Sequence, residues 1–240
     1  MKVHSLLGGA LLAATIALPL SARAEEVPSA VAPSPRSASR VPEINLALGF
    51  RSMIMPSIGL DPFSASNAVS QVSFVAGPTL LKRGAFSVAA LAEWDYVRIK
   101  GTARANEARL VLHRLGVGLE SRFEAARRLT FFAKIAPAAV HLGGSLTDPG
   151  SARPLVTGSW SWALDTTAGA AFMFSSTGPR EAPTSRFWLT GELGYGFAGM
   201  SDMVYKPEPQ EDDPRIYGAI MLPALRPAGA LARGSVAVSF

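Results

Sequence analysis

From residue 42 onward, apolar and polar side chains alternate along the chain with a period of two. In segment 43–51 the even-numbered residues are apolar, whereas the odd-numbered residues are polar or small. This alternation is typical of β-strands that have one apolar and one polar face. The pattern predicts eight strands, at about 43–51, 71–80, 85–100, 109–123, 129–142, 159–174, 186–200 and 228–240.

The predicted connections tend to alternate between long loops and short turns. They span 53–68, 82–84, 101–107, 124–128, 143–158, 175–185 and 201–227. An up-and-down antiparallel barrel has its short turns at one rim and its longer loops at the other. Segment 175–185 is longer than strict alternation requires. The longest connection, 201–227, has an acidic, proline-rich middle at 206–214 that is expected to be irregular, and an apolar patch at 220–225 that is expected to be partly ordered.

Aromatic side chains gather near the ends of the apolar faces. Such rings suit a membrane–water boundary, where the ring lies among acyl chains and its polar atom among headgroups. We therefore expect an all-β, up-and-down antiparallel transmembrane barrel of eight strands rather than a soluble β-sandwich. The expected interface aromatics are Trp94, Tyr96, Trp160, Trp162, Phe172, Phe174, Phe187, Tyr195 and Phe197.

The N-terminal residues do not share the alternation. Residues 1–24 combine Lys2, an apolar stretch from about Leu6 to Leu20, and the small-residue triplet that ends at Ala24, which together predict a cleaved secretory signal. Residues 25–41 are rich in Pro, Ala and Ser and are expected to be a periplasmic lead-in. Residues 42–240 would form the barrel. Beyond the signal, no apolar window is long enough for a spanning helix, so a membrane crossing would have to use strands.

The terminal strand, 228–240, alternates in the same way and ends on the aromatic residue Phe240. It resembles the last strand of bacterial outer-membrane barrels, and the resemblance implies that Phe240 is an assembly signal read by the barrel-assembly machinery. Over 42–240 the chain resembles small barrels of the OmpA and OmpW type. This implies a monomer in contact with outer-membrane lipid, with a non-enzymatic role in envelope structure or in surface interaction through an extracellular ligand at its loops.

The polar faces of the strands would line a lumen that side chains can fill. Acidic and basic residues nearly balance there, which predicts a network of salt bridges, because buried charges persist only when they are paired. A static ionic plug and a narrow channel for small solutes are both compatible with this composition. The predicted lumen network comprises Glu43, Arg51, Glu93, Asp95, Arg114, Glu120, Arg122, Lys134, Asp165, Glu192 and Arg233.

Few residues suggest other chemistry. The chain has no cysteine, and its net charge of +5 is dispersed, so we expect neither thiolate chemistry nor nucleic-acid binding. Histidines are too few for a metal centre, and no cofactor is expected.

Some eight-stranded barrels hydrolyse lipid A, and His141, Ser145 and Asp148 are the nearest candidates here. Since strand residues four apart are about 13 Å apart, this arrangement is not expected to be catalytic.

Overall fold

The computed structural model describes residues 43–103, 106–147, 154–178, 185–207 and 219–240. The predicted signal (1–24) and lead-in (25–41) lie outside these residues. The described residues belong to one compact unit that begins at Val41. Within them, no helix has the length and apolar character needed to cross a membrane.

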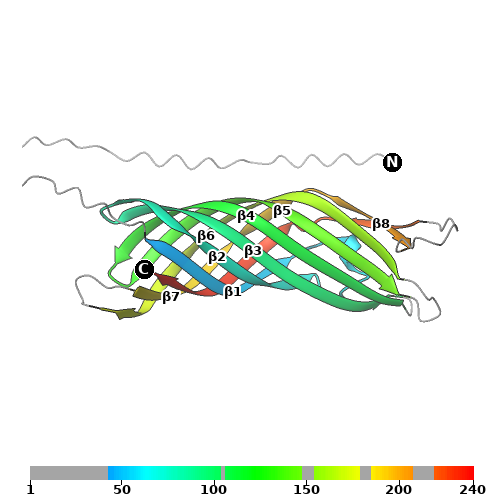
Figure 1. The fold of residues 1–240 in the computed structure, drawn as a ribbon, viewed down its shortest axis with the longest axis horizontal. Coiled ribbons are helices and arrows are strands. Elements are labelled where there is room, and N and C mark those ends of the chain that lie inside the picture. Colours follow the sequence, from blue (N-terminus) through cyan, green and yellow to red (C-terminus); the bar gives the residue numbers. More distant parts are fainter. Residues whose placement is uncertain (1–42, 104–105, 148–153, 179–184, 208–218) are drawn as a thin grey trace, which may run out of the picture. The chain divides into compact units, whose positions relative to one another are not determined.

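Eight strands pair in sequence and close on themselves into a ring (Figure 1). All neighbours are antiparallel, and the ring closes through the pairings of β1 with β10 and of β5 with β6. This confirms the predicted eight-stranded up-and-down barrel. The strands of the ring are β1 (Ile44–Ile54), β2 (Ala68–Arg83), β3 (Phe86–Ala103), β4 (Asn106–Ala126), β5 (Leu129–Thr147), β6 (Leu155–Thr177), β7 (Ser185–Ala198) and β10 (Gly229–Ser239).

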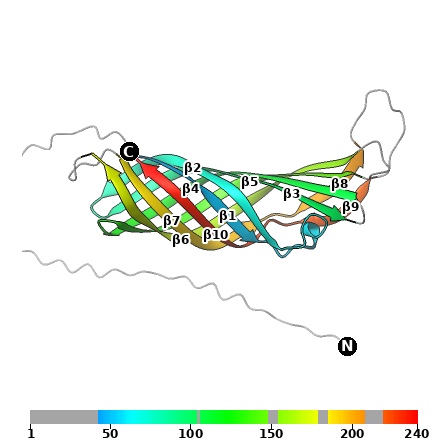
Figure 2. The same ribbon diagram turned by 90° about the horizontal axis from the view of Figure 1, so that it is seen from below.

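The two ends of the barrel differ. At the turn end, β2 and β3 meet in a tight turn at Gly84, whose φ of 60° is a conformation that suits glycine. The seam between β1 and β10 also reaches this end, where the Ile44 and Phe240 backbones exchange hydrogen bonds of 2.9 and 3.1 Å. The ladder is thus closed around the barrel, and this closure is what lets a barrel cross a membrane. The two longest connections of the ring, from β1 to β2 and from β7 to β10, lie at the opposite end (Figure 2).

Most strands extend further than the sequence pattern predicts. β5 continues to Thr147 and β6 begins at Leu155, so most of the predicted loop 143–158 is strand. The predicted loop 53–68 contains the end of β1 and a short 3₁₀ helix, η1 (Ile58–Leu60). The strands grow because each neighbour offers hydrogen-bond partners beyond the segment in which apolar and polar residues alternate.

Two segments of the predicted connection 201–227 form strands, and the second of them is the apolar patch expected at 220–225. Most of the acidic middle of this connection lies outside the described residues. β8 (Ser201–Pro207) and β9 (Ile220–Leu225) form an antiparallel hairpin. The pairing of β6 with β7 begins only at Ala163 of β6. β7 therefore leaves the start of β6 with an open edge. β8 covers that edge by pairing with β6 at residues 155 and 156.

The outer surface of the ring is apolar and is bordered by aromatic rings. Seven of the nine expected interface aromatics are exposed, while Tyr96 and Phe187 are half-buried against the rings of Trp94 and Phe174. On β6, Trp162 and Phe172 are ten residues apart. Ten residues span about 33 Å along a strand, or roughly 25 Å across a bilayer at the usual barrel tilt, which matches the apolar band of membrane barrels.

Candidate functional site

The middle of the lumen is filled by an ion cluster of four cations and four anions. Each of its side chains is at most 6% exposed. All lie at inward positions of the ring, so the alternation that exposes the apolar residues also brings these charges together. The ion cluster consists of Arg51 from β1, Glu93 and Asp95 from β3, Arg114 from β4, Lys134 from β5, Asp165 from β6, Glu192 from β7 and Arg233 from β10.

Arg114 lies at the centre of this ion cluster. Its guanidinium is 2.9 Å from Glu93, 3.1 Å from Asp95 and 3.0 Å from Asp165, and it donates a further hydrogen bond of 3.2 Å to the carbonyl of Ala136. One cation thus joins acidic side chains from β3 and β6 to the backbone of β5. Charge-assisted hydrogen bonds of this kind are the strongest that side chains make, and they hold the facing walls of the lumen together.

Lys134 and Arg233 extend the ion cluster toward the turn end. Lys134 lies 2.7 Å from Glu93 and 2.9 Å from Glu192. Arg233 lies 3.1 Å from Glu93, 3.4 Å from Asp95 and 3.0 Å from Glu192. Every charge has at least two opposite partners or a neutral hydrogen-bonding neighbour, as buried ions require.

Two neutral residues complete the ion cluster, and sequence reasoning missed both. The Arg51 guanidinium, 2.9 Å from Asp165, also donates to the amide oxygen of Gln71 at 3.2 Å. The Thr167 hydroxyl donates to Glu192 at 3.3 Å. Gln71 is the direct cross-strand partner of Arg51, so the register of β1 and β2 was the signal that could have identified it.

Three residues of the predicted network lie outside the ion cluster, nearer the turn end. Glu43 is at the rim, 3.7 Å from Lys82 and 4.0 Å from Arg186. Glu120 and Arg122 form a separate pair on β4, with an N–O distance of 2.6 Å. The predicted network is therefore three groups of ion pairs, because the eleven charges lie at different heights along the barrel.

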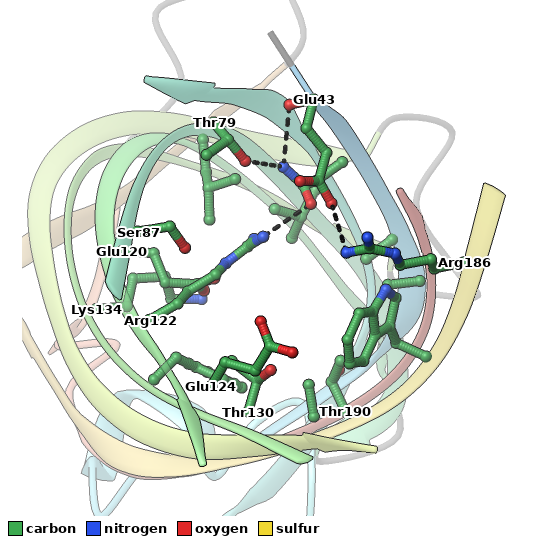
Figure 3. Close-up of a pocket in the computed structure, with 18 of the residues that line it drawn as sticks. Glu43, Thr79, Ser87, Glu120, Arg122, Glu124, Thr130, Lys134, Arg186 and Thr190 are labelled. Carbon is green, nitrogen blue, oxygen red and sulfur yellow. Dashed lines mark hydrogen bonds and ion pairs between the residues drawn. The ribbon is translucent and has the colours of Figure 1, made fainter. Parts of the chain in front are cut away.

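A cavity of about 110 Å³ opens at the turn end and is floored by the ion cluster. Polar side chains from several strands point into it, among them Arg122, Thr130 and Thr190 (Figure 3). Arg122 crosses the cavity to donate to the Asn45 side chain at 2.8 Å. The cavity has room for a handful of water molecules and reaches no further than the buried charges.

The other half of the lumen is apolar, which corrects the expectation of a polar core throughout. Here the inward positions of β4 and β5 are occupied by large apolar side chains such as Leu110, Leu112 and Leu142, each at most 2% exposed. Above the membrane band these strands carry apolar residues on both faces. The rule that inward residues of a membrane barrel are polar does not predict this pattern. The other buried members include Met53, Met55, Leu60, Phe63, Val69, Val140, Met203, Tyr205, Leu225 and Leu231.

This apolar core is closed by a cap, which we define as residues 55–67, 199–207 and 219–228. η1 and β9 contact each other, and the backbone of Arg226 donates to the Ser57 hydroxyl at 3.3 Å. Tyr205 of β8 is fully buried, and its hydroxyl lies directly over Gly144 of β5, where a Cβ atom would collide with it. Gly144 is therefore the socket that lets Tyr205 anchor the cap.

Burial raises the pKa of the Tyr205 phenol, since no charged partner stabilises its ionised form among the described residues. A raised pKa means that the neutral phenol favours the closed cap. That stability is complete below the ordinary tyrosine pKa of about 10 and is lost as the pH rises above it.

In an alkaline absorbance titration, one of the four tyrosines should ionise later than the others, together with release of the cap. Ionisation of all phenols in one step would contradict this.

Of the hydrolase candidates, the two described residues, His141 and Ser145, do not form a catalytic arrangement. His141 faces outward on β5, with its ring 4.9 Å from that of Trp160. Ser145 lies further along the same continuous strand, paired with residues of β4 and β6, and nothing folds the two together. Asp148 lies outside the described residues. Within those residues, no group of three or more His, Cys, Asp or Glu side chains could hold a metal ion.

Known proteins similar to this chain are found among solved structures. No family model matches the sequence, and no curated protein matches it. Three solved structures are similar over 82% of this chain: Neisserial surface protein A (12% identity, 94% of that chain, TM-score 0.40), the attachment invasion locus protein Ail of Yersinia pestis in complex with sucrose octasulfate (8%, 97%, 0.43), and a major outer membrane protein from Thermus thermophilus (11%, 99%, 0.47). The barrel assignment itself rests on the closed ring of strand pairings.

Proposed function

We propose that this barrel spans the bacterial outer membrane without conducting solutes, and that it presents its cap at the cell surface for envelope structure or surface interaction. The observation that carries this proposal is that the lumen is blocked twice along its axis. The ion cluster blocks the middle, and the apolar core under the cap blocks the loop end. A water-filled path would have to break both.

The remaining expectations belong to the same proposal. Cleavage near Ala24 would leave residues 25–41 in the periplasm, with the turn end of the barrel on that side. Phe240 would guide assembly, and its backbone pairing with Ile44 means that its recognition and the closure of the ring involve the same segment. We propose a monomer in contact with outer-membrane lipid and no role for nucleic acid or for enzymatic activity. An extracellular ligand would bind at the cap.

Reconstitution into planar bilayers tests this function. The folded protein, identified by a gel mobility that changes only on boiling, should insert without producing conductance steps. A general porin reconstituted in the same way provides the conducting reference. Regular steps that change when Arg114 or Glu93 is neutralised would contradict the proposal and support the narrow channel instead.

A further inference from the structure

Basic residues gather on the outer face of the barrel, just beyond the aromatic band at the loop end. Arg98 and Lys100 lie on β3, and Arg109 on β4 is the direct cross-strand partner of Lys100. Across β5 and β6 the same row of cross-strand partners continues to Val156, which pairs with Lys206 of β8. A single row of neighbouring strands thus carries cations at both of its ends.

The arrangement of these cations favours an anion. Like charges placed directly opposite each other on one face of a sheet destabilise the pair, as Lys100 and Arg109 do here. Glu107 lies 3.3 Å from Arg109, but among the described residues Arg98 and Lys100 have no acidic partner. The Nε atom of Arg109 is also buried without a hydrogen-bond acceptor among those residues. An external anion at this surface would relieve the repulsion between Lys100 and Arg109.

A shelf without side chains lies between these cations and the aromatic band. Gly143 and Gly158 are cross-strand partners on this face, and a Cβ atom on either would be within 3.7 Å of the His141 imidazole. We call the basic residues Arg98, Lys100 and Arg109, with these two glycines, the cation shelf. The two glycines add no side chains to this surface, and the His141 imidazole borders it.

The row below the shelf fixes its level in the membrane. Tyr96, His113, His141 and Trp160 are successive cross-strand partners on β3, β4, β5 and β6. Neighbouring rings in this row have centroids 4.9 to 6.5 Å apart. A continuous ring row of this kind belongs at the boundary between acyl chains and headgroups, so the cation shelf lies at headgroup level.

A groove of about 580 Å³ lies on the lipid-facing side of β2 to β5, directly below this row. Its walls are large apolar side chains such as Trp94 and Leu115, and its floor is made of small ones such as Ala92 and Ala139. Small residues between large ones hollow the surface to accept an acyl chain. The groove therefore lies below the cation shelf, just as the acyl chains of a lipid lie below its headgroup.

We infer that this face binds a phosphorylated glycolipid of the outer leaflet, with a phosphate on the cation shelf and an acyl chain in the groove. The inference rests on the proposed membrane placement. Lys100 and Arg109 provide the charge-assisted donors for the phosphate, and Ser145 lies beside Arg109 with a hydroxyl for the sugar.

Native mass spectrometry of the full mature barrel in detergent tests this inference, with bis-phosphorylated lipid A as probe and phosphatidylethanolamine as competitor. The wild type should prefer lipid A. Lys100→Ser/Arg109→Ser should weaken that binding at least about tenfold, the loss expected for two charge-assisted hydrogen bonds. Lys100→Arg/Arg109→Lys should retain it.

Two variants separate the site from general attraction. Arg83→Ser/Arg128→Ser removes the same charge from exposed residues at the turn end and should bind lipid A like the wild type. Ala139→Phe fills the groove while leaving the cation shelf intact, and it should also weaken binding. An equal loss in both double-serine variants, or no preference over phosphatidylethanolamine, would overturn the site.

The fold of each variant is checked by gel mobility before and after boiling. A folded, membrane-inserted barrel that binds lipid A equally well with and without the Lys100→Ser/Arg109→Ser substitutions would overturn the site alone. A wild-type protein that stays soluble and shows no mobility shift would overturn the membrane placement and the site with it.

Discussion

Replacing Arg114 with methionine should destabilise the barrel by about 3–5 kcal/mol, the usual cost of leaving a buried charge without its partner. Methionine fills a similar volume but leaves Glu93, Asp95 and Asp165 with one cation fewer in a part of the lumen that water does not reach. Urea unfolding in lipid vesicles, followed by tryptophan fluorescence, measures the change.

Two further variants identify the cause. Arg83→Met removes a cation from an exposed position and should change stability by no more than about 0.5 kcal/mol. Arg114→Met combined with Asp165→Asn restores the balance of charge and should recover part of the loss. If Arg114→Met unfolds at the same urea concentration as the wild type, the ion cluster is hydrated and does not close the lumen.

Replacing Gly144 with alanine should loosen the cap by about 1–3 kcal/mol, as expected when a methyl group is forced into a packed core. The new Cβ would collide with the Tyr205 hydroxyl and lie 3.0 Å from a methyl of Thr157. Hydrogen exchange of the β8 and β9 amides measures the effect, because these strands are held to the barrel through Tyr205. A Cβ atom added at the exposed Gly191 would have no neighbour within 4 Å, so Gly191→Ala is the matched control.

A second substitution tests whether the collision is the cause. Tyr205→Phe removes a buried hydroxyl that has no hydrogen-bond partner among the described residues, so by itself it should cost little. In the Gly144→Ala background the same change should restore protection, giving a coupling energy of about 1 kcal/mol or more. Additive effects of the two substitutions would show that Gly144 is not the socket for Tyr205.

Residue periodicity was sufficient for the ring because every strand crosses the same two environments. A side chain that faces lipid must be apolar, and its neighbours on the strand must face the lumen, so one rule assigns both faces. The inward positions of Arg114 and Glu93 followed from this rule before any partner was known. Which of the inward charges meet did not follow, because that depends on the stagger between strands rather than on any single strand.

The cap was missed for a related reason. Its segments 201–207 and 220–225 are too short for periodicity to be decisive, and β8 forms because β7 ends before β6 does. Likewise, the sequence pattern does not distinguish the apolar inward residues of β4 and β5 from any other run of buried apolar residues. The Gly144 socket is visible only when Tyr205, distant in sequence, is placed over it.

The sequence by itself therefore determined the number of strands in the ring, their lipid-facing sides and the presence of paired charges in the lumen, since these depend on local alternation and on the cost of burying ions. Only the tertiary structure decided that eight of the charges form one central cluster, that the loop end is sealed by an apolar core, and that cations, rings and a groove lie next to one another on β2 to β6. Those features depend on register between strands, which sets the height at which each side chain meets its neighbours.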